Sequence, residues 1–186
     1  SPPLPLSASH LRSPSPPPLR AWANGHLYMD SLLDRHAATT GLPKHDLPLL
    51  QAIVSSVLRN RRLLDHWIGQ LRKGKLDHEP RDILRVGVAQ LLILGIADHA
   101  AVNETVSCGK VSVRGLIDAV LRQCIARREQ LVDELDGLSP ELKFSHPDWL
   151  WRRWKKSYGA NKATQLLEWN NQAAKTYCRV NLLHKD

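Results

Sequence analysis

Cysteine is scarce in this sequence, and long apolar runs are absent. The three cysteines, Cys108, Cys124 and Cys178, are odd in number and widely spaced, with no Cys-x-x-Cys pair. This usage argues against a disulfide framework or a zinc site and fits a reducing cytoplasm. The nine histidines show no His-Glu-x-x-His or other paired spacing, so no metal ligand is expected. No run of 18 apolar residues occurs, which argues against a membrane-spanning helix.

The beginning of the chain has little that could form a core. Residues 1–20 hold seven of the twelve prolines together with five serines, so we predict that they are disordered. No acidic residue precedes Asp30, and Arg12 and Arg20 give the segment a weak similarity to a transit peptide. The chain begins with serine and its only methionine is Met29, so we expect a processed or trimmed product, or a misplaced start.

From about Ala21 onward, apolar residues recur at helical spacing, and no convincing strand-like alternation occurs. The predicted fold class is therefore all-α, with about six helices and a further helical segment in the tail. The first five helices are expected near Tyr28–Leu33, Asp46–Leu58, Leu63–Leu71, Pro80–Leu94 and Asp98–Val106. The sixth and longest is expected from about Arg114 to Leu135. Gln90 lies in the apolar fourth helix, where we interpret it as making an interhelical hydrogen bond.

A change of composition divides the chain near its last quarter. Residues 136–145 include a glycine and a proline and are predicted to be a linker. Residues 146–186 then begin a second module, where Ser145 and Asp148 resemble a capping box at a helix start.

Three blocks of sequence stand out in the helical part: Ser56-Val57-Leu58-Arg59 with Leu64-Asp65, then Ile83–Leu92 with His99–Val106, and finally Gly115–Arg122. In their order and spacing they resemble the NusB domain, over about residues 21–135. That resemblance implies a NusB-like helical bundle that binds RNA.

Two families share this domain: the free antitermination factor NusB and the Sun/Fmu-type methyltransferases of 16S ribosomal RNA. A free NusB would normally stop near the end of the sixth helix. The present tail continues, and it is similar to the entry of the methyltransferase half, which favours the methyltransferase family. The similar segments are His146-Pro147-Asp148-Trp149-Leu150, Arg153-Trp154, Tyr158-Gly159, Asn170-Asn171 and Arg179-Val180-Asn181.

The resemblance implies the RNA-binding, substrate-targeting part of an S-adenosylmethionine-dependent 16S rRNA (cytosine-5) methyltransferase. A free antitermination adaptor that binds boxA-like RNA and a small ribosomal protein is the alternative. A third hypothesis is a helical interaction domain without an RNA role.

The chemistry of cytosine-5 methylation has no counterpart here. The reaction needs an activated cysteine thiolate and a bound methyl donor. The family's glycine-rich adenosylmethionine loop and its two cysteine motifs are missing, and the three cysteines are better interpreted as small packed hydrophobes. We therefore predict that this chain alone is inactive and holds no cofactor, and we expect S-adenosylmethionine only in a catalytic domain.

The formal net charge of +8 favours a partner with a phosphate backbone. The family resemblance implies that this partner is 16S rRNA. Residues 146–186 carry eight basic and three acidic residues, which is +5 of that total. In the helix that begins near Trp149, three basic residues follow at offsets of three, four and seven: Arg152, Arg153 and Lys156. Leu150, Trp154 and Tyr158 are expected on the opposite side.

The functional interpretation is that this basic face follows RNA phosphates, with an exposed tryptophan stacking on a base. The alternative is a solvated face on a helix docked by its tryptophans. A second basic cluster, Arg59, Arg61, Arg62, Arg72 and Lys73, is a further RNA-binding candidate, although part of it could be ordinary surface charge.

Overall fold

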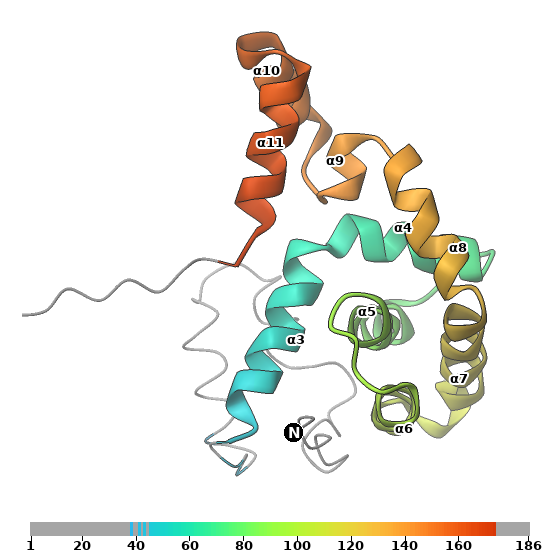
Figure 1. Ribbon diagram of the computed structural model, residues 1–186. Helices are drawn as coiled ribbons and strands as arrows, with labels where there is room; N and C mark the ends of the chain where they lie inside the picture. Colours follow the sequence, from blue (N-terminus) through green and yellow to red (C-terminus); the bar gives the residue numbers. More distant parts are fainter. Residues whose placement is uncertain (1–37, 39–40, 42, 44, 174–186) are drawn as a thin grey trace, which may run out of the picture.

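A computed structural model of the chain describes residues 38, 41, 43 and 45–173. The disordered segment predicted at 1–20, the helix expected at Tyr28–Leu33 and Cys178 lie outside these residues. The described part is helical, without a strand, which confirms the all-α prediction (Figure 1). The helices are α3 (Leu47–Arg59), α4 (Arg61–Leu71), α5 (His78–Leu92), α6 (Asp98–Cys108), α7 (Val111–Ala126), α8 (Arg128–Asp133), α9 (Pro140–Lys143), α10 (Asp148–Tyr158) and α11 (Ala160–Asn171), with a 3-10 turn η1 (Glu134–Gly137).

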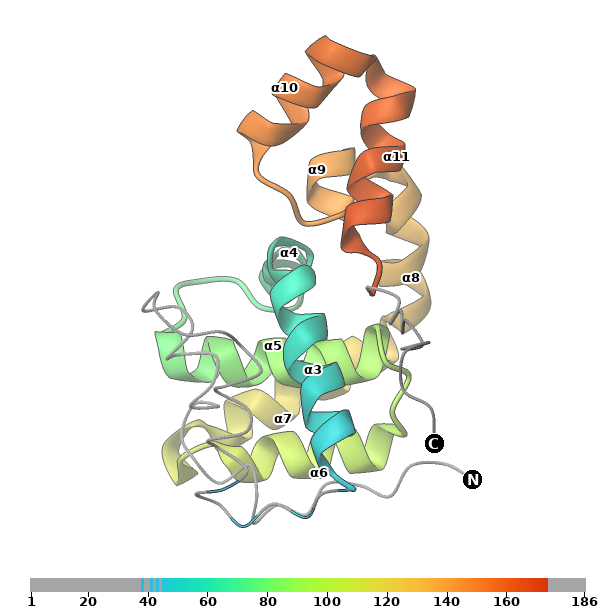
Figure 2. The same ribbon diagram turned by 90° about the vertical axis from the view of Figure 1, so that its left-hand side faces the viewer.

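Helix α5 forms the centre of a bundle. It packs against α3, α4, α6 and α7, and Figure 2 shows α3 crossing the layer of α5, α6 and α7. Every residue from Ile83 to Leu91 is buried, because neighbouring helices cover α5 on all sides. At Gly87 a Cβ would lie 2.7 Å from Leu121 Cδ2 and 2.9 Å from Thr105 Cγ2, so glycine permits the close approach of α6 and α7.

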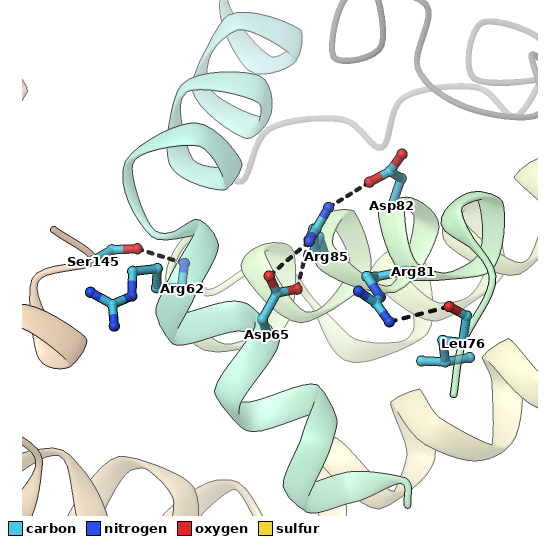
Figure 3. Close-up of polar contacts among 7 residues, drawn as sticks. All are labelled: Arg62, Asp65, Leu76, Arg81, Asp82, Arg85 and Ser145. Carbon is cyan, nitrogen blue, oxygen red and sulfur yellow. Dashed lines mark hydrogen bonds and ion pairs between the residues drawn. The ribbon is translucent and has the colours of Figure 1, made fainter. Parts of the chain in front are cut away.

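Two polar side chains buried in α5, Gln90 and Arg85, are paired with residues of neighbouring elements, whereas the buried Ser56 hydroxyl of α3 has no partner among the described residues. Gln90 Nε2 donates a hydrogen bond to Thr105 Oγ1 of α6 at 3.1 Å, which confirms the interhelical role predicted for Gln90. Arg85 is buried and binds both carboxylate oxygens of Asp65, at 2.7 and 2.8 Å, and Asp82 Oδ1 at 2.7 Å (Figure 3). Desolvation tends to lower the pKa of Arg85, but hydrogen bonds and charges from the two aspartates outweigh it and raise that pKa.

The prediction of one long sixth helix over residues 114–135 is wrong. Helix α7 ends at Ala126, Arg127 has non-helical dihedrals (φ −107°, ψ 16°), and a separate helix α8 follows. The break is held by distant contacts: Arg127 Nη1 donates to the carbonyl of Gln70 at 3.2 Å, and Trp67 Nε1 donates to the carbonyl of Leu131 at 3.2 Å. These hydrogen bonds hold α8 beside α4.

The segment predicted as a linker, 136–145, also contains regular structure, because it includes the end of η1 and all of α9. The capping box predicted from Ser145 and Asp148 is wrong. The N-cap residue of α10 is Pro147, without a side-chain hydrogen bond, and the Ser145 hydroxyl instead accepts the backbone N–H of Arg62 at 2.6 Å (Figure 3).

Helices α10 and α11 form a hairpin that projects from the bundle in both views, with α9 beside its base (Figures 1 and 2). Gly159 connects them with φ +80° and ψ 162°, a conformation open to glycine and strained for other residues. Within the described residues of the hairpin, Ala163 and Leu167 are the buried positions, and α10 has none. The hairpin is therefore mostly surface.

Candidate nucleic-acid interface

One side of α10 is an exposed row that we call the α10 stripe: Trp149, Arg152, Arg153 and Lys156. At offsets of three, four and seven residues, these side chains lie on one face and span about 10 Å along the helix axis. Leu150, Trp151 and Trp154 are half-buried. Of the residues expected on the packed side, Tyr158 is an exception, because it is 55% exposed.

Arg62 of α4 contacts the entry to α10. Its Nη1 lies 2.8 Å from Asp148 Oδ1 and also donates to the carbonyl oxygen of His146. Asp148 is the only acidic residue of α10, so this ion pair offsets the negative charge next to the α10 stripe. Arg62 is one of the residues predicted to contact RNA. Its half-buried guanidinium is engaged with the α10 entry segment, and a contact with RNA stays a prediction.

His146 is buried at the base of the hairpin and contacts one residue before α10 and one near the end of α11. Its Nδ1 lies 2.6 Å from the carbonyl oxygen of Phe144, and its Nε2 lies 2.8 Å from Asn170 Nδ2. A neutral imidazole protonated at Nδ1 satisfies both contacts, since Nδ1–H donates to the carbonyl and Nε2 accepts from the amide. The Trp154 ring lies 6.4 Å from the imidazole ring, centroid to centroid, so His146 ties α10 and α11 together.

A second tie joins the end of α11 to the bundle. Asn171 Nδ2 donates to Asn60 Oδ1 at 3.1 Å, and Asn60 lies in the turn between α3 and α4. These polar contacts between bundle and hairpin form what we call the junction cluster. Its members are Asn60, Arg62, Ser145, His146, Asp148, Asn170 and Asn171.

The second predicted basic cluster is split by the fold. Arg59 and Arg61 are exposed and flank Asn60, next to the junction cluster. Arg72 and Lys73 follow the far end of α4, about 15 Å away along its axis. Arg72 is half-buried and donates to the carbonyl of Lys75 at 3.1 Å, whereas Lys73 is exposed.

Burial keeps the described thiols in their neutral form. Desolvation raises the pKa of Cys108 to about 11, with a further contribution from the Glu104 carboxylate. Desolvation likewise raises the pKa of Cys124 to about 11, and its side chain is fully buried in the core, as predicted for a packed hydrophobe. A nucleophilic cysteine needs a lowered pKa, so neither thiol has the environment of a catalytic cysteine.

The described residues offer neither a candidate metal site nor a candidate membrane span. They contain no group of three or more His, Cys, Asp or Glu side chains that could hold a metal ion. None of the helices in this part of the chain is long and apolar enough to cross a membrane.

The junction cluster is the feature that sequence reasoning missed. Asn60 lies between two arginines and gives no periodic signal, and its partner Asn171 is 111 residues away. Asn170-Asn171 and His146 belong to the segments that resemble the methyltransferase family, but nothing in the sequence indicates that these residues meet.

Comparison with known families adds two matches. Residues 19–126 match the NusB family, and residues 146–186 match the domain described as Methyltr_RsmF/B-like, ferredoxin-like. The second match begins at the buried histidine of the junction cluster and includes the α10 stripe.

Curated relatives with similar sequences carry the name ribosomal RNA small subunit methyltransferase B. The protein from Escherichia fergusonii is 35% identical over 147 residues, which are 75% of this chain and 33% of the relative. The proteins from Escherichia coli O127:H6 and Shigella flexneri serotype 5b are 35% and 34% identical, with the same coverage. The chain thus spans about one third of the length of these relatives.

Proposed function

Because the chain belongs to the NusB family and continues into a ferredoxin-like segment of the RsmF/B type, we propose that it binds and positions the RNA substrate of a 16S rRNA (cytosine-5) methyltransferase. A free antitermination adaptor for boxA-like RNA is the competing function, favoured by the NusB match alone. The tail distinguishes the two, since a free NusB does not need it.

The α10 stripe is the observation that carries this proposal. It presents three cations on one exposed helix face, and the only carboxylate of α10 is paired with Arg62. Such a surface attracts phosphates and releases their counterions when it binds. It also lies within the segment that matches methyltransferases, so family and charge point to the same residues.

We assign roles to the basic residues as follows. Arg152, Arg153 and Lys156 contact RNA phosphates, and Arg59 and Arg61 extend this surface at the base of the hairpin. Arg72 and Lys73 make a more distant and weaker contribution, because they lie beyond the other end of α4. Arg62 holds the entry to α10 and acts on RNA only through that placement.

The catalytic step belongs to a further domain in this proposal. S-adenosylmethionine and the nucleophilic cysteine reside there, and the present chain methylates nothing by itself. RNA that carries 5-fluorocytosine tests this point, because an active enzyme would become covalently trapped on it. A trapped complex with the 186-residue chain would overturn this part of the proposal.

We further propose that the protein works in the cytoplasm, where ribosomes are assembled from ribosomal RNA and protein.

RNA binding by the whole chain tests the proposal directly. We expect affinity for a 16S rRNA fragment that falls steeply with salt and exceeds affinity for a boxA-like RNA of equal length. Lys156→Gln should weaken binding and reduce the slope of log affinity against log salt by about one. Lys155→Gln is the matched control, since Lys155 is also exposed but lies off the stripe, with its Nζ 5.8 Å from the centre of the Trp151 ring.

Two outcomes would contradict the proposal. Preference for boxA-like RNA would favour the antitermination function. Salt-independent or absent RNA binding would leave the helical interaction domain as the better hypothesis.

A further inference from the structure

Trp149 is exposed on α10 and, unlike the other tryptophans of this helix, takes part in no ring contact among the described residues. Its side chain is 62% exposed, whereas the other two tryptophans of α10 are half-buried. Trp154 lies against His146, and Trp151 lies under Lys155, so these two rings take part in local packing. An exposed large aromatic ring costs free energy in water, and a ring at a fixed helix position is typical of a contact surface.

The neighbours of Trp149 define what could cover it. Arg152 and Arg153 follow one turn later on the same face, and Lys156 follows after two turns. Asp148 precedes the ring, and its charge is paired with Arg62. Along the stripe, the exposed ring is therefore followed by three cations, and the stripe contains no other apolar side chain. An apolar protein surface would meet unpaired charge there, whereas a nucleotide offers a flat base and an adjoining phosphate.

We propose that the α10 stripe is a binding site for single-stranded RNA, in which Trp149 stacks on one unpaired base and the three cations contact the phosphates that follow. The proposal rests on the proposed function and adds the form of the RNA. Only an unpaired base exposes its face to an aromatic ring, since bases within a duplex are already stacked. The ring would contribute affinity without sequence preference, because every base has a π-face.

The hairpin contains a matched control. Trp169 of α11 is 70% exposed, which is comparable with Trp149. Its helical neighbours three and four positions earlier, Gln165 and Leu166, are uncharged, and α11 ends at Asn171, two residues after the ring. Among the described residues, the one cation at helical spacing from the ring is Lys162, two turns earlier. If exposure alone created affinity for bases, both tryptophans would act. If the juxtaposition with the three cations matters, Trp149 alone will act.

Binding of a fluorescein-labelled single-stranded 12-nucleotide RNA, and of the same RNA annealed to its complement, tests the proposal. With the whole chain, Trp149→Ala should weaken single-strand binding about 5- to 100-fold, the range that one base–aromatic stack supplies. Its salt slope and its duplex affinity should stay unchanged. Trp149→Phe should retain most of the affinity, and Trp169→Ala should behave as the original chain. Thermal melts of the variants should coincide, because both rings are exposed.

The failures are distinguishable. Equal loss in Trp149→Ala and Trp169→Ala, or no loss in either while salt-dependent RNA binding persists, would overturn this inference and leave the proposed function intact. Absence of salt-dependent RNA binding by the original chain would overturn both. If Trp149→Ala left RNA affinity unchanged and loosened the contact with a catalytic domain added in trans, the stripe would be a protein interface.

Discussion

The bundle and the hairpin differ in how their side chains are used. In α5, nine consecutive residues are buried. Two of them are polar, and they bind residues of other helices: Arg85 binds Asp65, and Gln90 binds Thr105. In α10 none is buried, and the hairpin exposes Trp149, Tyr158 and Trp169. Burial on this scale makes the bundle the source of stability, whereas the hairpin leaves large side chains on its surface, where the proposed RNA would contact one of them.

The boundary between the two regions is polar. The junction cluster joins them through hydrogen bonds and one ion pair, at Asn60, Arg62 and their partners. Polar contacts of this kind fix a direction but contribute little free energy each, because water competes for the same groups. We therefore expect the hairpin to open at lower free energy than the bundle unfolds.

Leucine truncations in each region should give the largest contrast. Leu121 and Leu167 are both fully buried, the first in α7 of the bundle and the second in α11. Leu121→Ala should lower the free energy of global unfolding by about 3 kcal/mol, measured in urea, because it leaves a cavity. Leu167→Ala should leave the urea midpoint nearly unchanged and abolish hydrogen-exchange protection in α10 and α11. Equal shifts of the global midpoint would show that both regions unfold as one.

The buried ion pair of the bundle should give the next effect. Asp65→Ala leaves Arg85, whose side chain is 8% exposed, with Asp82 alone, so we expect a loss of about 2 kcal/mol. The control is Asp118→Ala, which breaks a surface pair with the 71% exposed Arg122 and should cost far less, because solvent screens that pair. Chemical denaturation measures both, and similar losses would contradict the role assigned to burial.

Local patterns predicted the structure wherever local forces decide it. The apolar spacing of 83–91 predicted α5, and its single polar interruption, Gln90, predicted a hydrogen bond to a neighbouring helix. The α10 stripe was also predictable, because residues three, four and seven apart must share a helix face. Whether those residues bind RNA stays a prediction.

Distant contacts explain what local patterns could not predict. The apolar spacing continues through Arg127, so nothing nearby indicates a break there. The break depends on Gln70 and Trp67, which lie 57 and 64 residues from their partners. Ser145 resembled a helix cap, yet its hydroxyl accepts a hydrogen bond from the backbone N–H of Arg62, 83 residues earlier. The junction cluster depends on the same kind of pairing.

Breaking the junction itself should have a small global effect and a clear local one. Arg62→Ala removes the ion pair with Asp148 and the bond to the His146 carbonyl, and it keeps the backbone bond to Ser145. We expect a loss below about 1 kcal/mol in global stability but faster hydrogen exchange in α10 and α11. Arg61→Ala, at the exposed neighbouring position, is the control. Unchanged exchange in Arg62→Ala would mean that apolar packing alone holds the hairpin.

The smallest effect at neutral pH is expected from the thiols of the bundle. Burial raises the folded-state pKa of Cys108 and Cys124 to about 11, above the ordinary value of 9.0. Below pH 9 both thiols are neutral in the folded and unfolded chain, so they contribute no pH dependence. Between pH 9 and 11 the unfolded chain loses these protons first, and stability should fall as pH rises.

A Cys178→Ser variant isolates these two thiols. Its stability should decline more steeply above pH 9 than that of a variant that also carries Cys108→Ala and Cys124→Ala, in urea titrations at each pH. At pH 8 the two thiols should react slowly with a maleimide until urea unfolds the bundle, because reaction requires the thiolate. Fast labelling of the folded chain at pH 8 would show that the bundle opens as readily as we expect of the hairpin, which would remove the contrast between the two regions.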